Sequence, residues 1–121
     1  HAQVEKIHFA GHPSSPWYEL AQQYLPKGAG SVLGFDISGG FDAAVAFVDA
    51  LDLHSHVANI GDVRSLVIHP ASTTHSQLDD AALEAAGVNQ GFVRLAVGLE
   101  GIEDILADLE KGFAAAAQVA S

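Results

Sequence analysis

Strand-like and helix-like segments alternate along this chain, and several of the connections between them are short. The strand-like segments are 4–9, 31–37, 65–68 and 92–97, and the helix-like segments are 17–25, 41–51, 79–86 and 102–113. A parallel pair of strands needs a long crossover connection, so the short connections favour antiparallel or mixed pairing. We therefore predict an α+β fold, a small open-faced sandwich with a mainly antiparallel sheet and helices on one face.

Two of the helices can be oriented by apolar residues that recur every three or four positions. In the helix at 41–51 the expected buried stripe is Phe41, Ala44, Val45, Val48 and Leu51. In the last helix the expected buried residues are Ile102, Ile105, Leu106, Leu109 and Phe113, opposite Glu103, Asp104, Asp108 and Glu110. The alanine-rich end after Phe113 is expected to fray, and Ser76 is the expected N-cap of the helix at 79–86.

The composition indicates one domain with a hydrophobic core and excludes several classes of partner. The 121 residues are 49% hydrophobic, and 15 Asp and Glu outnumber 5 Lys and Arg. Nucleic acid and anionic membranes attract clustered basic residues, so neither is an expected partner. There is no cysteine for a disulfide or thiolate metal site, and the spacing of the seven histidines is not specific for a metal, so no metal site is expected. No apolar run approaches the ~20 residues that span a bilayer and no signal peptide is recognised, so the expected location is cytoplasmic.

Arg94 lies in the middle of the strand-like run at 92–97, in a chain with few basic residues. The odd-numbered residues of this run alternate onto one face of the predicted strand, so Arg94 shares the other face with Phe92 and Ala96. A guanidinium keeps its charge, and its planar fork suits a carboxylate or a phosphate. Three interpretations of Arg94 remain open: an ion pair with an Asp or Glu of the chain, an edge-strand arginine that reaches water, or a site for an anionic ligand.

Other polar segments also have a structural and a functional interpretation. The segment 59–62 can form an Asx turn, or the Asn59 amide can help Arg94 to orient a carboxylate. The segment 28–31 resembles a phosphate-binding turn, but it precedes a strand rather than a helix, so a simple turn is the better interpretation. None of the three lysines has the apolar surroundings expected of a Schiff-base lysine: Lys6, Lys27 and Lys111.

Three segments of the chain together resemble one known family. They are PKGAGSVLGFDISGG (26–40), ANIGDVRSLVIHPASTTHSQL (58–78) and FVRLAVGLEGIEDILADLE (92–110). In this order and spacing they are similar to the C-terminal third of the pyridoxal-phosphate enzymes of cysteine and methionine metabolism. The resemblance covers about 17–113 and is greatest to the O-acetylhomoserine sulfhydrylase branch, within the cystathionine gamma-synthase-like enzymes.

The resemblance implies specific roles for three residues. Arg94 matches the arginine of the family's RLSVG-E motif, which holds the α-carboxylate of the amino-acid substrate. Asn59 falls at a position that contacts the same carboxylate, and Thr74 matches a threonine that lines the site. The lysine that carries pyridoxal 5'-phosphate in the family has no counterpart here, so catalytic and cofactor-binding residues are expected only outside this fragment.

The resemblance further implies that residues 1–121 are a single C-terminal substrate-clamping domain, inactive without the large cofactor-binding N-terminal domain. A chain that begins at His1 and contains no methionine agrees with a fragment or a processed product. The implied activity is formation of L-homocysteine from O-acetyl-L-homoserine and sulfide, in methionine biosynthesis, by a full-length enzyme expected to be a homotetramer.

Two departures from the family pattern bear on the branch. Ala96 replaces the serine of the RLSVG-E motif, which should leave the clamp intact. Ala58 stands where the lyase branch often has glutamate, which weakens a lyase assignment. The alternatives are a cystathionine gamma-synthase or lyase of the same family, and a free-standing, non-catalytic module that binds a small ligand.

Overall fold

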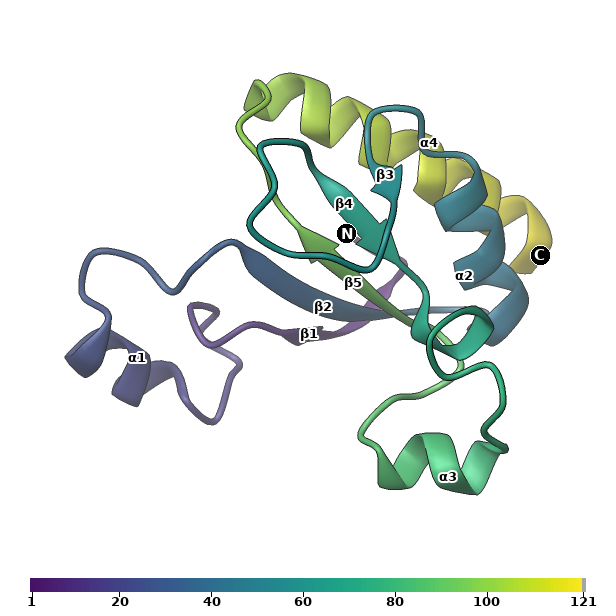
Figure 1. The fold of residues 1–121 in the computed structure, drawn as a ribbon, viewed down its shortest axis with the longest axis horizontal. Helices are drawn as coiled ribbons and strands as arrows, with labels where there is room; N and C mark the ends of the chain where they lie inside the picture. Colours follow the sequence, from purple (N-terminus) through teal and green to yellow (C-terminus); the bar gives the residue numbers. More distant parts are fainter. Residues whose placement is uncertain (121) are drawn as a thin grey trace.

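The structure, a computed structural model, describes residues 1–120 and contains a five-stranded sheet in that range (Figure 1). The strands are β1 (Val4–His8), β2 (Val32–Ile37), β3 (Ser55–His56), β4 (Leu66–Ile68) and β5 (Phe92–Ala96). Their order is β1-β2-β5-β4-β3, and the pairs are antiparallel except for β3 with β4. The predicted α+β fold with a mainly antiparallel sheet is confirmed.

The two longest helices, α2 (Gly40–Asp49) and α4 (Ile102–Ala120), pack side by side on one face of the sheet (Figure 1). Alternate strand residues point toward these helices, because successive side chains of a strand face opposite sides. The core between the two layers is built mainly from Phe35, Ile37, Val67, Val93 and Leu95 of the strands and Phe47 and Phe113 of the helices. The opposite face of the sheet carries the candidate site.

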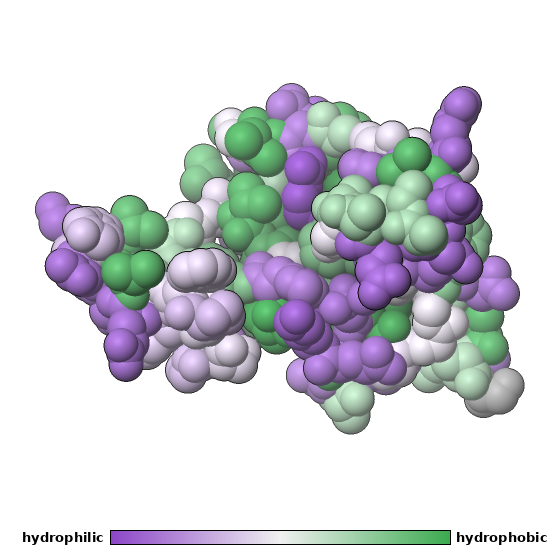
Figure 2. Space-filling model, turned by 90° about the horizontal axis from the view of Figure 1, so that it is seen from below, coloured by the Kyte–Doolittle hydropathy of each residue, from purple (hydrophilic) through white to green (hydrophobic). Residues whose placement is uncertain are grey.

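Two shorter helices lie away from the sheet. They are α1 (Tyr18–Tyr24) and α3 (Asp80–Ala85), and a 3-10 turn, η1 (Pro70–Ser72), follows β4. The arm that contains α1 presents apolar surface at one end of the molecule, where Leu20 and Leu25 are about half exposed (Figure 2). Within residues 1–120, no helix is both long and apolar enough to cross a membrane.

The buried faces of the helices differ from the prediction. In α2, Phe47 is fully buried and Phe41 is 39% exposed, so the buried stripe is rotated from the expected one. This helix is apolar on most of its circumference, so the 3.6-residue period does not select one stripe. In α4, Ile102 and Leu106 are exposed rather than buried.

The ends of two helices also need correction. The alanine-rich segment after Phe113 does not fray: α4 continues to Ala120, and Ala116 is completely buried. Helix α3 is capped by Asp79 rather than Ser76, because the Asp79 carboxylate accepts a 2.8 Å hydrogen bond from the Ala82 N–H.

Asp108 of α4 was expected in water but is only 3% exposed. Its carboxylate accepts hydrogen bonds from the backbone N–H groups of Asp52 (2.8 Å) and His54 (3.0 Å) and from His54 Nδ1 (2.7 Å). Burial alone would raise the pKa of Asp108, but the His54 side chain and these N–H donors outweigh it and lower the pKa to about 2. The ionised carboxylate therefore ties the segment between α2 and β3 to α4.

Candidate functional site

Arg94 projects from the sheet face opposite the helices, as predicted. Its neighbours Val93 and Leu95 lie in the core, whereas Arg94 is half-buried on the other side. Arg94 pairs with Gly34 of β2 and Ile68 of β4, so it stands on the central strand of the sheet and not at an edge. The edge-strand interpretation is therefore wrong, and the base of the side chain is held by a rigid element.

The Arg94 guanidinium points to the loop at 57–64. Its Nη2 donates a 3.4 Å hydrogen bond to the main-chain carbonyl of Asn59. None of the ion pairs formed within residues 1–120 includes Arg94, so the internal ion-pair interpretation is also wrong. One long bond to a neutral carbonyl uses one of five N–H donors, which leaves the others for an anion.

The structure brings Asn59 to Arg94 through its backbone. The Asn59 side-chain oxygen accepts a 2.9 Å hydrogen bond from the next N–H, that of Ile60, whereas an Asx turn uses the N–H two residues on. The bond of that kind in this loop is at Asp62, whose carboxylate accepts a 2.9 Å bond from the Arg64 N–H. Thr74 is exposed, and its hydroxyl is 2.8 Å from Nδ1 of His75. Within residues 1–120 no hydrogen bond joins Thr74 to Arg94, so the substrate-binding roles of Asn59 and Thr74 stay predictions.

The loop that carries Asn59 is fastened to the end of β5 by Glu100. The Glu100 carboxylate accepts two 2.8 Å hydrogen bonds, from the backbone N–H and the hydroxyl of Ser65, and the same hydroxyl accepts a 3.0 Å bond from the Gly98 N–H. The Ser65 N–H and hydroxyl hold the pKa of Glu100 below its usual range. The Leu99 N–H adds a 2.8 Å bond to the Val63 carbonyl.

His69 fixes the chain immediately after β4, one residue beyond Ile68, the strand partner of Arg94 in β4. Its ring is fully buried, with Nε2 2.7 Å from the Gln90 carbonyl and Nδ1 2.9 Å from the Ser72 hydroxyl. Burial lowers the pKa of His69, so the ring is neutral. A carbonyl only accepts, so Nε2 carries the proton and Nδ1 accepts from Ser72. These bonds join the segment that leads to Thr74 to the start of β5.

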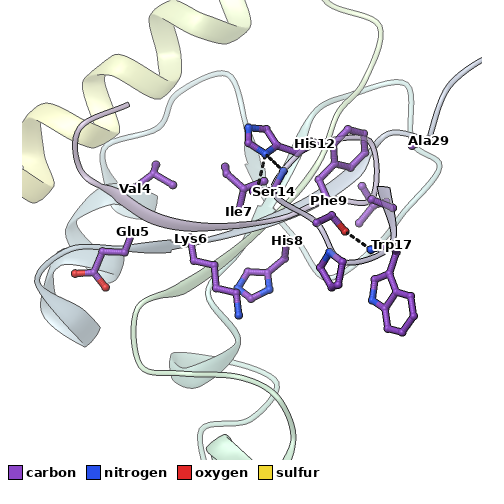
Figure 3. Close-up of a pocket in the computed structure, with 14 residues that line it drawn as sticks. Val4, Glu5, Lys6, Ile7, His8, Phe9, His12, Ser14, Trp17 and Ala29 are labelled. Atoms are coloured by element: carbon purple, nitrogen blue, oxygen red, sulfur yellow. Dashed lines mark hydrogen bonds between the residues drawn. The ribbon is translucent and has the colours of Figure 1, made fainter. Parts of the chain in front are cut away.

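A hollow of about 790 Å³ lies elsewhere, along β1 and the turn that follows it (Figure 3). The segments 4–10 and 14–17, together with His12, Ala29 and Val32, line this hollow. The hollow does not include Arg94, Asn59 or Thr74, so it is separate from the candidate site. Among residues 1–120, no group of three or more histidine, aspartate or glutamate side chains could hold a metal ion.

Sequence reasoning missed the residues that support the site. Glu100 is the glutamate of the RLSVG-E motif, but that motif does not predict its pairing with Ser65, which lies 35 positions earlier. The Asp36 carboxylate of β2, paired with His8 of β1, was also missed, although it lies on the same sheet face as Arg94. Only the register of β1 and β2 would have revealed this pair, and register cannot be read from the sequence of one strand.

Comparisons with known proteins point to one family. Residues 1–114 match the family of Cys/Met metabolism PLP-dependent enzymes. An O-acetyl-L-homoserine sulfhydrylase from Corynebacterium glutamicum is 63% identical over 95% of this chain and 26% of its own length. An L-methionine gamma-lyase from Fusobacterium nucleatum subsp. nucleatum is 43% identical over 93% of this chain and 28% of its own length.

A solved structure shows the same fold. The cystathionine gamma synthase from Xanthomonas oryzae pv. oryzae, in complex with cystathionine, superimposes with a TM-score of 0.87 and 39% identity. The match covers 98% of this chain and 30% of that protein. The chain thus spans about a quarter to a third of the length of the relatives that it matches.

Proposed function

We propose that this chain, which belongs to the pyridoxal-phosphate-dependent enzymes of cysteine and methionine metabolism, is the substrate-clamping domain of an O-acetylhomoserine sulfhydrylase. The complete enzyme would replace the acetate of O-acetyl-L-homoserine by sulfide and release L-homocysteine, a step of methionine biosynthesis. The identity of 63% to a sulfhydrylase supports this choice of reaction.

The observation that carries the proposal is the Arg94 guanidinium, which is held at the centre of the sheet and pairs with no carboxylate of residues 1–120. In the complete enzyme it would bind the substrate's α-carboxylate through two parallel N–H···O bonds. The Asn59 carbonyl would hold the guanidinium plane toward the loop, and the bonds from Glu100 to Ser65 would hold that loop in place. A fixed carboxylate fixes the orientation of the rest of the substrate.

The lysines of this chain do not fit attachment of pyridoxal phosphate. Lys111 forms a 2.9 Å ion pair with Asp52, which raises its pKa, and Lys6 and Lys27 are exposed. A lysine that forms a Schiff base needs a lowered pKa in a desolvated place. Cofactor binding would therefore depend on the part of the enzyme outside this chain, and the isolated chain would be inactive.

The proposal includes two further properties of the complete enzyme, a cytoplasmic location and assembly as a homotetramer. The tetramer follows from the family resemblance, and the cytoplasmic location stays the prediction made from the sequence. Measurement of the mass of the full-length protein in solution tests the second.

A second candidate reaction belongs to the same family. The solved structure that resembles this chain contains cystathionine, which favours a cystathionine gamma-synthase or lyase as the alternative. Its 39% identity to this chain is well below the 63% found for the sulfhydrylase. A free-standing ligand-binding module would instead bind amino acids without any cofactor.

The test uses the full-length protein with pyridoxal phosphate and O-acetyl-L-homoserine, supplied with either sulfide or L-cysteine. We expect kcat/KM to be higher with sulfide, and the product to be homocysteine. A higher kcat/KM with cysteine and formation of cystathionine would support the alternative reaction. The isolated 121-residue chain is the matched control, and homocysteine formation by it would contradict the proposed division of roles.

A further inference from the structure

Arg94 has an acidic neighbour with which it does not pair. On the sheet face opposite the helices, Phe92 lies across from Asp36 and Arg94 lies across from Gly34. Asp36 and Arg94 are therefore diagonal neighbours on adjacent strands, a separation that a long side chain can bridge. In a chain of formal charge −10 such a pair is expected, yet the Arg94 guanidinium bonds to the Asn59 carbonyl instead.

The Phe92 ring occupies the other diagonal of the same four residues. A Cβ on Gly34 would lie 2.5 Å from both Cε2 and Cζ of Phe92, so the ring lies directly over Gly34. Because the line from Phe92 to Gly34 crosses the line from Asp36 to Arg94, the ring stands between the carboxylate and the guanidinium. Only glycine at position 34 leaves room for the ring in this place.

A second contact draws Asp36 away from Arg94. His8 of β1 lies opposite Gly34, and its Nε2 is 2.9 Å from Asp36 Oδ2. The His8 ring also meets the Phe92 ring edge to face, with centroids 5.3 Å apart. His8 projects from β1 on the same side as Lys6, whose strand partner is Asp36 (Figure 3). The carboxylate is thus enclosed by β1 and the Phe92 ring, and Asp36 is 7% exposed.

We propose that Phe92 is a positioning residue that, with Gly34 and His8, separates Arg94 from Asp36 and so keeps the guanidinium available to the substrate's carboxylate. The inference deepens the proposed function and rests on it. Without the ring, Asp36 and the incoming carboxylate would compete for the same donors. If Asp36 engaged nine-tenths of the Arg94 population, the apparent affinity for the substrate would fall about 10-fold.

The experiment measures steady-state kinetics of the full-length enzyme and its variants Phe92→Ala, Asp36→Asn and the double variant. We expect Phe92→Ala to raise the KM for the amino-acid substrate about 10-fold and to leave the KM for sulfide unchanged. The double variant, in which Asp36→Asn is added to Phe92→Ala, should return the KM for the amino-acid substrate toward the wild-type value, because the competing charge is gone. If the role of Phe92 is purely structural, this KM stays raised in both Phe92→Ala and the double variant, and that result would overturn the inference.

Two additions keep the test decisive. If Phe92→Ala fails to fold, Phe92→Leu retains apolar volume without the flat ring, and a smaller rise in KM with the same rescue is expected. If the wild-type enzyme does not use O-acetyl-L-homoserine, the proposed function fails, and the crystal structure of the Phe92→Ala protein then decides this inference. An ion pair between Arg94 and Asp36 in that structure supports it, and a guanidinium still on the Asn59 carbonyl contradicts it.

Discussion

Replacement of Gly98 by alanine should open the contact between β5 and the loop that carries Asn59. A Cβ at this position would lie 2.5 Å from the carbonyl carbon of Arg64 and 2.6 Å from the nitrogen of Ser65, and it would also strike the Val63 carbonyl. Ordinary contact begins at 3.4 Å, and the obstacles are backbone atoms, so the two segments must separate by about 1 Å.

Such a shift is large compared with the bond that it disturbs. The bond from Arg94 to the Asn59 carbonyl is already 3.4 Å long, so a further displacement of about 1 Å breaks it. The overpacking should cost about 1–3 kcal/mol of folding free energy. A misplacement of about 1 Å at a substrate-positioning group can lower the rate about 100-fold, so we expect a loss of that order in kcat/KM.

The assay is kcat/KM of the full-length enzyme for O-acetyl-L-homoserine, together with urea unfolding of the same proteins. Gly101→Ala is the matched control, because its Cβ would meet only the Asp104 side chain, at 3.4 Å. The control should change kcat/KM by less than about twofold, as is usual for an exposed position. If Gly98→Ala behaves like the control, the fastening of this loop does not position Arg94, and the reasoning fails.

Three further predictions concern stability and titration of the 121-residue chain. The pKa of Asp108 is about 2 in the folded state and 3.8 ordinarily, so its stabilisation is complete above pH about 4 and is lost as the pH falls toward 2. In urea unfolding at a series of pH values, this loss of about 2 kcal/mol should be absent from Asp108→Asn. Ala116→Leu should lower the free energy of unfolding by about 1–3 kcal/mol, because Ala116 is fully buried. Its control, Ala117→Leu at an exposed position, should stay within about 0.5 kcal/mol of the wild type. Equal urea-unfolding midpoints for the two variants would mean that the end of α4 frays. The ring of His69 should titrate by NMR below its ordinary value of 6.5, and a value at or above 6.5 would contradict the neutral, buried ring.

The sequence was most informative where a local pattern of apolar residues is compatible with only one orientation of the element. The alternation of β5 placed Val93 and Leu95 in the core and Arg94 on the opposite face, because the period of a strand is two. It was less informative in α2, where apolar residues surround the helix and the choice between Phe41 and Phe47 depends on the sheet beneath.

Polar contacts between distant segments could not be predicted. Asp108 has the sequence context of a solvated helix residue, and its partner His54 is 54 positions away. The same holds for Glu100 with Ser65, whose pairing depends on how β5 and the loop meet in space. The proposed role of Arg94 rests on the family motif, while the residues that hold its side chain and the neighbouring loop in place came only from the three-dimensional arrangement.

The central claim is that Arg94 binds the substrate's carboxylate, and Arg94→Lys in the full-length enzyme tests it most directly. Lysine keeps the charge but cannot form two parallel bonds from a planar fork. Loss of one charge-assisted hydrogen bond, about 1.5–3 kcal/mol, should raise the KM for O-acetyl-L-homoserine about 10- to 100-fold. Arg64→Lys is the matched control, since Arg64 is exposed and pairs with Asp62 at 3.4 Å, and its KM should not change. An Arg94→Lys enzyme with the wild-type KM and kcat would contradict the account.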